Sequence, residues 1–324
     1  MAKLNVNDTI IITDNKEVTD MAITNIKEFA EAVAQKINEV QNKYEASVTE
    51  VVKMNDEKLY GVVLKTDKSN AAPTCYVDEL YEDYKDECAT LEDIAKSLVE
   101  YANNLPNTQI PDINFDFSFD AVRDKLSIRV AEIQRNKEFF EKIPYKEDYF
   151  GLGLGMIADI NYGNDYRTVV NEQLMKQFND EGHDKAEVLM TALRNASKIN
   201  PPRFGDMMSS IFGAPVNLLD DEDYEWDNDQ TMFVLTTENG LCGASALFYP
   251  GVIDKIAEIF RTGFFILPSS IHEVIILPDT GAHDAEALKQ MVLEANRTVV
   301  DPKDVLSDNV WYFSYLDSEI TIVA

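Results

Sequence analysis

The sequence predicts an α+β fold in which antiparallel β-hairpins pack against helices, in mixed helix–hairpin–helix modules. The clearest evidence lies between residues 231 and 300, where strand-like and helical segments alternate. Short apolar runs bounded by Gly, Pro or Asn are typical of strands, and a 3.6-residue apolar period is typical of helices. We expect strands at 231–238, 243–249, 264–268 and 273–278, and helices at 251–260 and 283–297.

The first hundred residues predict a smaller module of the same kind. Thr24 or Asn25 is placed to cap the first helix, and Thr90 with Asp93 resembles a capping box. The predicted elements are a helix at 24–42, strands at 46–54 and 58–66, a short strand at 74–77, and helices at 78–85 and 90–103.

The middle of the chain predicts a long helix, then a hairpin and a second helix. Pro144 is expected to end the long helix because its ring cannot occupy a helix interior. The predicted elements are a helix at 119–142, strands at 148–163 and 165–175, a helix at 184–197, a helical turn at 206–212 and a terminal hairpin formed by 310–316 and 319–324.

These elements group into five segments along a chain of 324 residues, which is long enough for more than one core. The segments are an extension at 1–22, an N-terminal α+β module at 23–104, a central helix–hairpin–helix region at 105–218, an acidic connector at 219–230 and a C-terminal α+β module at 231–324.

The charge balance limits the partners. Asp and Glu total 58 against 29 Lys and Arg, which gives a formal net charge of −29. Such a chain repels phosphate backbones and anionic lipid, so we expect neither direct nucleic-acid binding nor membrane binding. No apolar run is long enough to span a bilayer, and the first residues lack the apolar core of a signal peptide. Three cysteines without a CxxC pair suit a reducing compartment, so we expect a cytoplasmic location.

The alternating glycines of GLGLGM, Gly151, Gly153 and Gly155, are interpreted as one face of a strand against which another element packs closely. A phosphate-binding loop is disfavoured because that motif needs a strand before the glycines and a helix after them.

Two groups of residues are weak candidates for binding a ligand or partner. Ser269, Ser270, His272 and Glu273 gather polar groups between two predicted strands. Tyr224 and Trp226 are aromatic residues within an acidic connector, and aromatic side chains in such a setting often pack against another surface. The chain contains no GxSxG or HExxH motif, so no catalytic residue is predicted.

No metal or cofactor site is predicted either. The three histidines share no ligand spacing with one another or with a cysteine. The acidic run from Asp220 fails the EF-hand pattern because Glu225 stands where that loop requires glycine.

Several motifs follow one another in a distinctive order: YVDELYEDYKD, RNKEFFEKIPYKEDYFGLGLGMI, GASALFYPGVIDKIAEIF and FFILPSSIHEVIILPD. In this order the chain resembles an uncharacterised bacterial family, a domain of unknown function from anaerobic gut-type Gram-positive bacteria. The resemblance covers about residues 24–316. It implies no activity, cofactor or catalytic residue.

Because no set of acid, base, nucleophile or metal ligands is assembled, the leading hypothesis is a non-enzymatic cytosolic interaction or adaptor protein. It would act by surface docking, through hairpin edges or grooves beside helices, on a protein partner. One alternative is an acidic decoy that mimics DNA. Another is an enzyme whose site, around His272, Asp279 or Asp159, is hidden by sequence order.

Overall fold

The computed structural model describes residues 23–66, 72–104, 116–148, 150–162, 167–211 (the side chains of 210 and 211 excepted), 216–221, 223–227 and 232–324. The described residues form two compact units. Those before residue 105, other than Met54–Asp56, belong to the first unit, and Met54–Asp56 with the residues from 116 onward belong to the second. Helices accompany three antiparallel sheets, so the predicted α+β class is confirmed.

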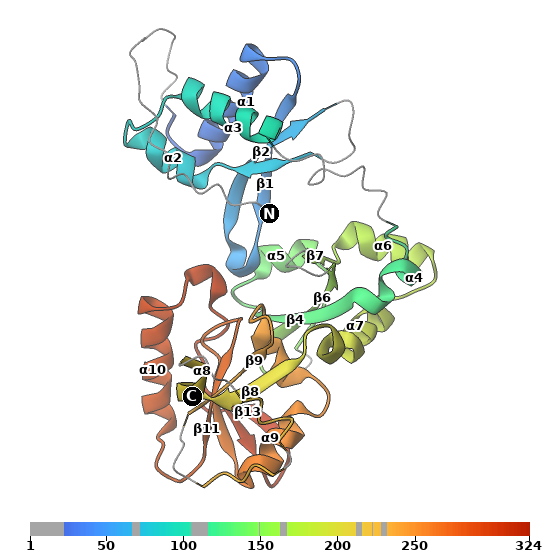
Figure 1. Ribbon diagram of the computed structural model, residues 1–324, viewed down its shortest axis with the longest axis vertical. Helices are drawn as coiled ribbons and strands as arrows, with labels where there is room; N and C mark the ends of the chain where they lie inside the picture. Colours follow the sequence, from blue (N-terminus) through green and yellow to red (C-terminus); the bar gives the residue numbers. More distant parts are fainter. Residues whose placement is uncertain are drawn as a thin grey trace. The chain divides into compact units, whose positions relative to one another are not determined.

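The first unit is a three-stranded sheet with helices packed on it (Figure 1). Its apolar core joins Phe29, Val33 and Ile37 to Leu64 and Leu98. The elements are α1 (Ile26–Val40), β1 (Glu45–Val52), β2 (Lys58–Lys65), β3 (Thr74–Tyr76), α2 (Asp78–Lys85) and α3 (Leu91–Asn104).

Every predicted element of this unit is confirmed to within a few residues. The Asn25 side chain accepts a hydrogen bond from the main-chain N–H of Glu28, so it caps α1 as expected. Thr90 and Asp93 form the predicted capping box, since the N–H of Asp93 donates to the Thr90 hydroxyl and the Asp93 carboxylate accepts from Thr90.

The second unit contains two sheets. In the smaller one, β4 (Leu126–Glu132) and β5 (Tyr145–Lys146) pair with β6 (Leu154–Asn161), which also pairs with β7 (Arg167–Val169). The larger sheet has the order β13-β12-β10-β11-β9-β8. Its strands are β8 (Pro202–Asp206), β9 (Phe233–Thr237), β10 (Phe264–Leu267), β11 (Val274–Pro278), β12 (Trp311–Ser314) and β13 (Glu319–Ile322).

Helices cover both sheets of this unit. The longest helices are α7, against β4, and α10, which lies along one face of the larger sheet (Figure 1). The helices of the unit are α4 (Phe119–Val122), α5 (Lys137–Lys142), α6 (Glu172–Asp180), α7 (Lys185–Ile199), α8 (Met207–Ile211), α9 (Val252–Phe260) and α10 (Ala285–Thr298), with 3-10 turns η1 (Met54–Asp56), η2 (Arg123–Lys125), η3 (Gly243–Phe248) and η4 (Pro302–Asp304).

Aromatic rings fill the core on the other face of the larger sheet. The ring of Phe264 stacks on that of Phe313, with centroids 4.8 Å apart. Phe260 of α9 meets Phe233 of β9 edge to face at 4.9 Å. Because both faces of β10 are buried, its sequence is an unbroken apolar run rather than an alternating one.

The prediction of one helix over 119–142 is wrong. A short helix is followed by η2 and then by β4, which pairs with β6 over its whole length. The β-branched residues Ile128 and Val130 alternate along β4 on a period of two, which favours a strand. Pairing with a buried strand therefore decides the structure here, although the apolar spacing over 119–142 also fits a helix.

The prediction of a strand over 243–249 is also wrong, because these residues form η3. Cys242 enters it with φ 51° and ψ 31°, in the left-handed region that an extended strand cannot include. A side chain on Gly243 would collide with the Thr236 hydroxyl and the His272 carbonyl, so only glycine permits this approach to β9.

Three further expectations need correction. The predicted strand 165–175 is short, because β7 ends at Val169 and α6 begins at Glu172. Strand β8 was not predicted, since two prolines flank its start. Of the alternating glycines, Gly155 lies in β6 against the rings of Phe140 and Tyr145, as expected, whereas Gly151 and Gly153 have φ of +69° and +73° and belong to a turn.

The remaining predicted elements, at 184–197, 206–212, 251–260, 264–268, 273–278, 283–297 and the terminal hairpin, are confirmed with small shifts of their ends. The extension at 1–22, most of the linker around 105–115, the turn at Gly163 and the predicted cap at Gly213 lie outside the described residues.

Candidate functional site

The polar cluster predicted between two strands is the connection from β10 to β11. Ser270 is 6% exposed, and its hydroxyl accepts a hydrogen bond of 2.9 Å from the N–H of His272. The carbonyl of Ser269 accepts from the N–H of Leu306, at 3.2 Å. Glu273 is exposed. The two serines therefore form the predicted turn, and they also hold it against the 304–307 segment.

Tertiary folding brings His272 together with residues that are distant in sequence. Its Nδ1 accepts a hydrogen bond of 3.3 Å from the main-chain N–H of Cys242, and its Nε2 lies 3.4 Å from a carboxylate oxygen of Asp304. The Thr236 hydroxyl donates to the His272 carbonyl at 2.7 Å. Sequence reasoning missed Cys242 and Asp304 because no spacing links them to His272.

A buried ion pair lies close to the same turn. Arg129 of β4 donates a hydrogen bond of 3.0 Å to one carboxylate oxygen of Asp159 of β6, and its Nε lies 2.9 Å from the other oxygen. The Asp159 side chain is only 2% exposed. Burial raises the pKa of Asp159, and the nearby Arg129 and Arg167 oppose that shift. Each charge of this ion pair therefore has a counterion in a region of low dielectric.

The Cys242 thiol has the properties of a packed side chain rather than of a nucleophile. Burial raises its pKa, so the thiol stays protonated near neutral pH. The nitrogen of His272 that faces Cys242 is occupied by the main-chain N–H instead of the thiol. In this arrangement the main chain of Cys242 and the side chains of His272 and Asp304 fix a tight turn.

The aromatic residues of the acidic connector pack on their own unit. The ring of Trp226 meets Phe260 of α9 edge to face, with centroids 5.3 Å apart, and it is partly buried. Burial raises the pKa of the nearby Tyr224 hydroxyl. The described part of the connector therefore rests on α9.

Asp279, a third residue of the hidden-site alternative, lies at the end of β11 near the surface. One of its carboxylate oxygens accepts a hydrogen bond of 2.9 Å from the Tyr312 hydroxyl. It does not join the cluster around His272. Within the described ranges, no three His, Cys, Asp or Glu side chains lie close enough to hold a metal ion.

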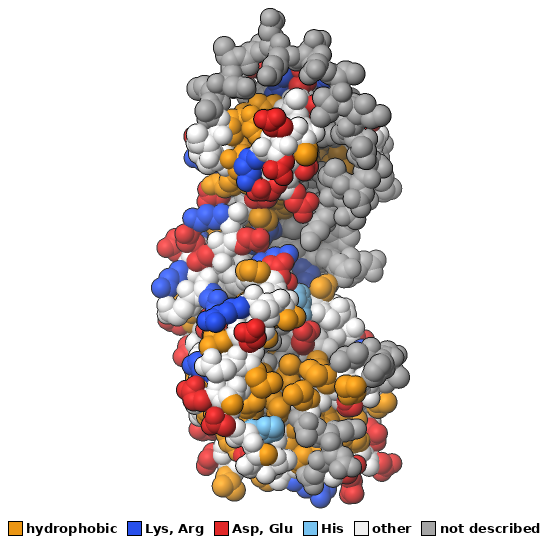
Figure 2. Space-filling model, turned by 90° about the vertical axis from the view of Figure 1, so that its left-hand side faces the viewer, with side chains coloured by type: hydrophobic (Ala, Val, Ile, Leu, Met, Phe, Trp, Pro, Cys, Tyr) orange, Lys and Arg blue, Asp and Glu red, His pale blue; other side chains and the backbone are white. Residues whose placement is uncertain are grey.

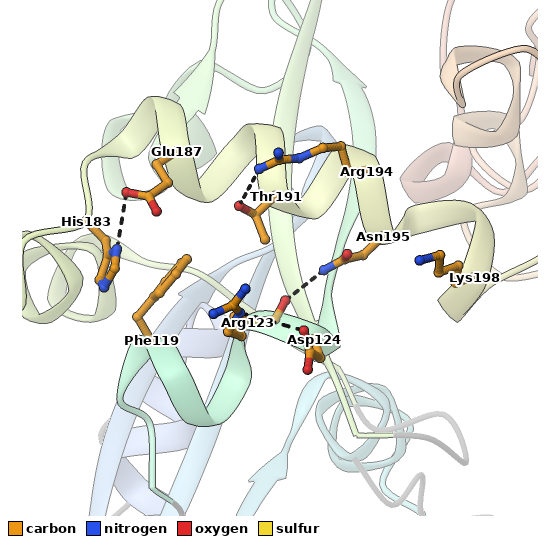
Figure 3. A pocket seen from close by; sticks show the side chains of 9 residues that line it. All are labelled: Phe119, Arg123, Asp124, His183, Glu187, Thr191, Arg194, Asn195 and Lys198. Carbon is orange, nitrogen blue, oxygen red and sulfur yellow. Dashed lines mark hydrogen bonds and ion pairs between the residues drawn. The ribbon is translucent and has the colours of Figure 1, made fainter.

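A groove of about 370 Å³ opens beside α7 (Figure 3). Three of the residues that line it are cationic, namely Arg123, Arg194 and Lys198. No sequence motif marks this groove, because α7 supplies one wall and α4 with η2 the other. The lining residues are Phe119, Arg123, Asp124, His183, Glu187, Thr191, Arg194, Asn195 and Lys198.

Large apolar side chains are exposed mainly on the second unit, and Figure 2 shows hydrophobic side chains gathered on one part of the face in view. Four of them lie at the terminal hairpin: Tyr315 and Leu316 in its turn, and Ile322 and Val323 at the far end of β13. Leu316 is 94% exposed. This hairpin is therefore the strongest candidate for a docking surface among the described residues.

The two edges of the larger sheet differ. At β8, the N–H of Phe204 donates to the Asn217 side chain at 2.9 Å, and the Phe204 carbonyl accepts from Leu218 at 2.8 Å. At the opposite edge, β13 pairs with β12 on one side, and no described strand pairs with its other side. Backbone groups of an unpaired edge can bind another strand.

The fold and these sites define an α+β protein with surface grooves and an open sheet edge. The described part of the chain contains no helix with both the length and the apolar content needed to cross a bilayer. The chain belongs to a family described as "Family of unknown function (DUF5688)", which matches residues 26–315. No curated protein and no solved structure matches the chain.

Proposed function

We propose that the protein is a non-enzymatic, cytosolic binding protein that docks an extended segment of a partner protein along β13. The observation that carries this proposal is the open edge of the larger sheet, with exposed apolar side chains at both ends of its last strand. In β-strand addition, main-chain hydrogen bonds supply affinity and side chains on alternate positions supply specificity.

The contrast between the two sheet edges supports this choice. The β8 edge is covered by residues 217–218 of the same chain. No such cover lies on β13 among the described residues, and exposed apolar side chains occupy its last position, Ile322, and the neighbouring positions Leu316 and Val323. Proteins commonly protect edge strands with lysine, proline or bulges. The sequence of β13, EITI, contains neither lysine nor proline.

The chemistry near His272 also favours binding over catalysis. Burial raises the pKa of the Cys242 thiol, and the Asp159 carboxylate is paired with Arg129. The decoy alternative requires carboxylates gathered at phosphate-like spacing. On the face in Figure 2, acidic side chains are interspersed with basic and neutral ones.

The test compares two lysine substitutions at exposed apolar positions. Ile322→Lys places a charge on the proposed docking edge, and Val299→Lys, at an 81% exposed site after α10, is the matched control. Each tagged protein is used to capture partners from native lysate with quantitative mass spectrometry. We expect a partner that wild type and Val299→Lys enrich and that Ile322→Lys loses.

Hydrogen exchange then locates the contact. Addition of the purified partner is expected to slow amide exchange in residues 319–323 of the wild type. Equal capture by both variants, protection confined to other segments, or no enriched partner would each contradict the proposal.

A further inference from the structure

The groove beside α7 concentrates positive charge on a protein whose formal net charge is −29. Arg194 and Lys198 come from the last two turns of α7, and Arg123 comes from η2 on the facing wall (Figure 3). Because the chain as a whole repels anions, such a local excess of cations is the feature that needs an explanation.

Arg194 and Lys198 form no ion pair within the part of the chain that the structure describes. There the Arg194 guanidinium donates to two neutral acceptors, the Met190 carbonyl and the Thr191 hydroxyl, both at 3.2 Å. Both side chains are exposed. Their charges are therefore available to a ligand.

The acidic residues of the groove lie near His183 and Arg123 and do not pair with the two cations that α7 contributes to the groove. Glu187 lies 3.2 Å from Nδ1 of His183, at the end of the groove away from Lys198 (Figure 3). The Arg123 guanidinium lies 3.7 Å from the Asp124 carboxylate and 3.9 Å from the Asp120 carboxylate, and these two acidic side chains are 93% and 84% exposed. At such exposure both pairs contribute little, so Arg123 can turn toward a ligand at small cost.

The walls of the groove are held together by contacts between α7 and the α4–η2 segment. The Asn195 side chain donates to the Arg123 carbonyl at 2.7 Å, which ties α7 to η2. The Phe119 ring stacks on His183 with centroids 3.9 Å apart and closes the other end. A space of about 370 Å³ is within the range of small-molecule sites.

We propose that this groove binds a small molecule carrying two or more negative charges, as phosphate or carboxylate groups, between Arg123, Arg194 and Lys198. Guanidinium groups bind such groups in a planar, two-pronged manner, and the lysine adds a mobile point charge. The site is separate from the β13 edge, so it stands whether or not that edge docks a partner.

The experiment measures binding of pyrophosphate and of citrate to the full-length protein by isothermal titration calorimetry at low salt. We expect saturable binding of at least one anion, and the stronger of the two identifies the ligand as a phosphate or a carboxylate compound. Raising the ionic strength is expected to weaken it, because the contacts are solvent-exposed charges.

Matched variants locate the site. Arg194→Ala and Lys198→Ala are each expected to weaken binding about tenfold or more, since each removes a charged contact. Lys185→Ala removes the same charge from the first turn of α7, outside the groove, and is expected to leave binding within about twofold. Circular dichroism confirms that each variant is folded.

Two outcomes would overturn the proposal. One is that neither pyrophosphate nor citrate binds to the wild type. The other is that Lys185→Ala weakens binding as much as Arg194→Ala and Lys198→Ala do, which would indicate attraction by overall charge instead of by the groove.

Discussion

Two arginines of the second unit illustrate opposite uses of the same side chain. Arg129 is 17% exposed and forms an ion pair with the buried Asp159. Arg194 is exposed, and within the described ranges its guanidinium donates to neutral oxygens of its own helix. Burial makes an unpaired charge costly, so the first arginine has to carry its own counterion. Water solvates the charge of Arg194, so this arginine needs no counterion from the protein and can bind an external anion.

The largest expected effect tests the buried arginine. Arg129→Met removes the counterion and leaves Asp159 buried, which is expected to lower the free energy of unfolding by about 3–5 kcal/mol near neutral pH. Urea unfolding followed by circular dichroism measures it. The double variant Arg129→Met with Asp159→Leu should recover most of the loss, because a buried ion pair can be replaced by apolar side chains of similar size.

The pH dependence sharpens the same prediction. Burial already raises the pKa of Asp159, and the loss of Arg129 raises it further. A carboxyl whose pKa is raised in the folded state stabilises the fold below its unfolded pKa, and this stability is lost as pH rises through the folded value. The penalty of Arg129→Met should therefore be smaller at pH 5 than at pH 7. If Arg129→Met lowered the free energy of unfolding equally at pH 5 and pH 7, protonation of Asp159 would not be linked to folding, and the prediction would be wrong.

A smaller effect tests how closely the backbone packs beside the buried pair. Gly243→Ala places a methyl group against the Thr236 hydroxyl and the His272 carbonyl, and the carbonyl is main chain that cannot move aside alone. We expect a loss of about 1–3 kcal/mol. Gly240→Ala is the comparison, since its added carbon meets nothing within 4 Å and its cost arises from a φ of +68° alone. Equal losses would contradict a packing origin.

The smallest expected effect belongs to the exposed arginine. Arg194→Ala and Lys198→Ala should change the free energy of unfolding by less than about 0.5 kcal/mol, because both side chains are exposed and neither makes an ion pair among the described residues. The same urea titration measures it. A loss as large as that of Arg129→Met would mean that the groove cations support the fold, and the contrast between the two arginines would no longer hold.

Local sequence predicted elements well where the pattern and the burial agree. Helix α1 buries Phe29, Val33 and Ile37 on one stripe, and its Asn25 cap follows from the residue type. Strand β4 shows the opposite case. Its residues fit a helical window as well as a strand, and only pairing with β6 decides between them.

The candidate sites were less accessible to prediction. The Ser269–Ser270 turn was predicted from residue type, but the contacts of His272 with Cys242 and Asp304 depend on segments that lie tens of residues away. The groove cations Arg123 and Arg194 share no motif, because one lies on η2 and the other on α7.

The sequence by itself determined the α+β class, most helices and hairpins, and the acidic character, because these depend on residue type and on short-range periodicity. Tertiary structure decided that β4 is a strand, that η3 is a tight turn, and which charges are buried and which stay free. The reason is physical: a strand and a buried charge are each stable only with a partner, and that partner lies elsewhere in the chain.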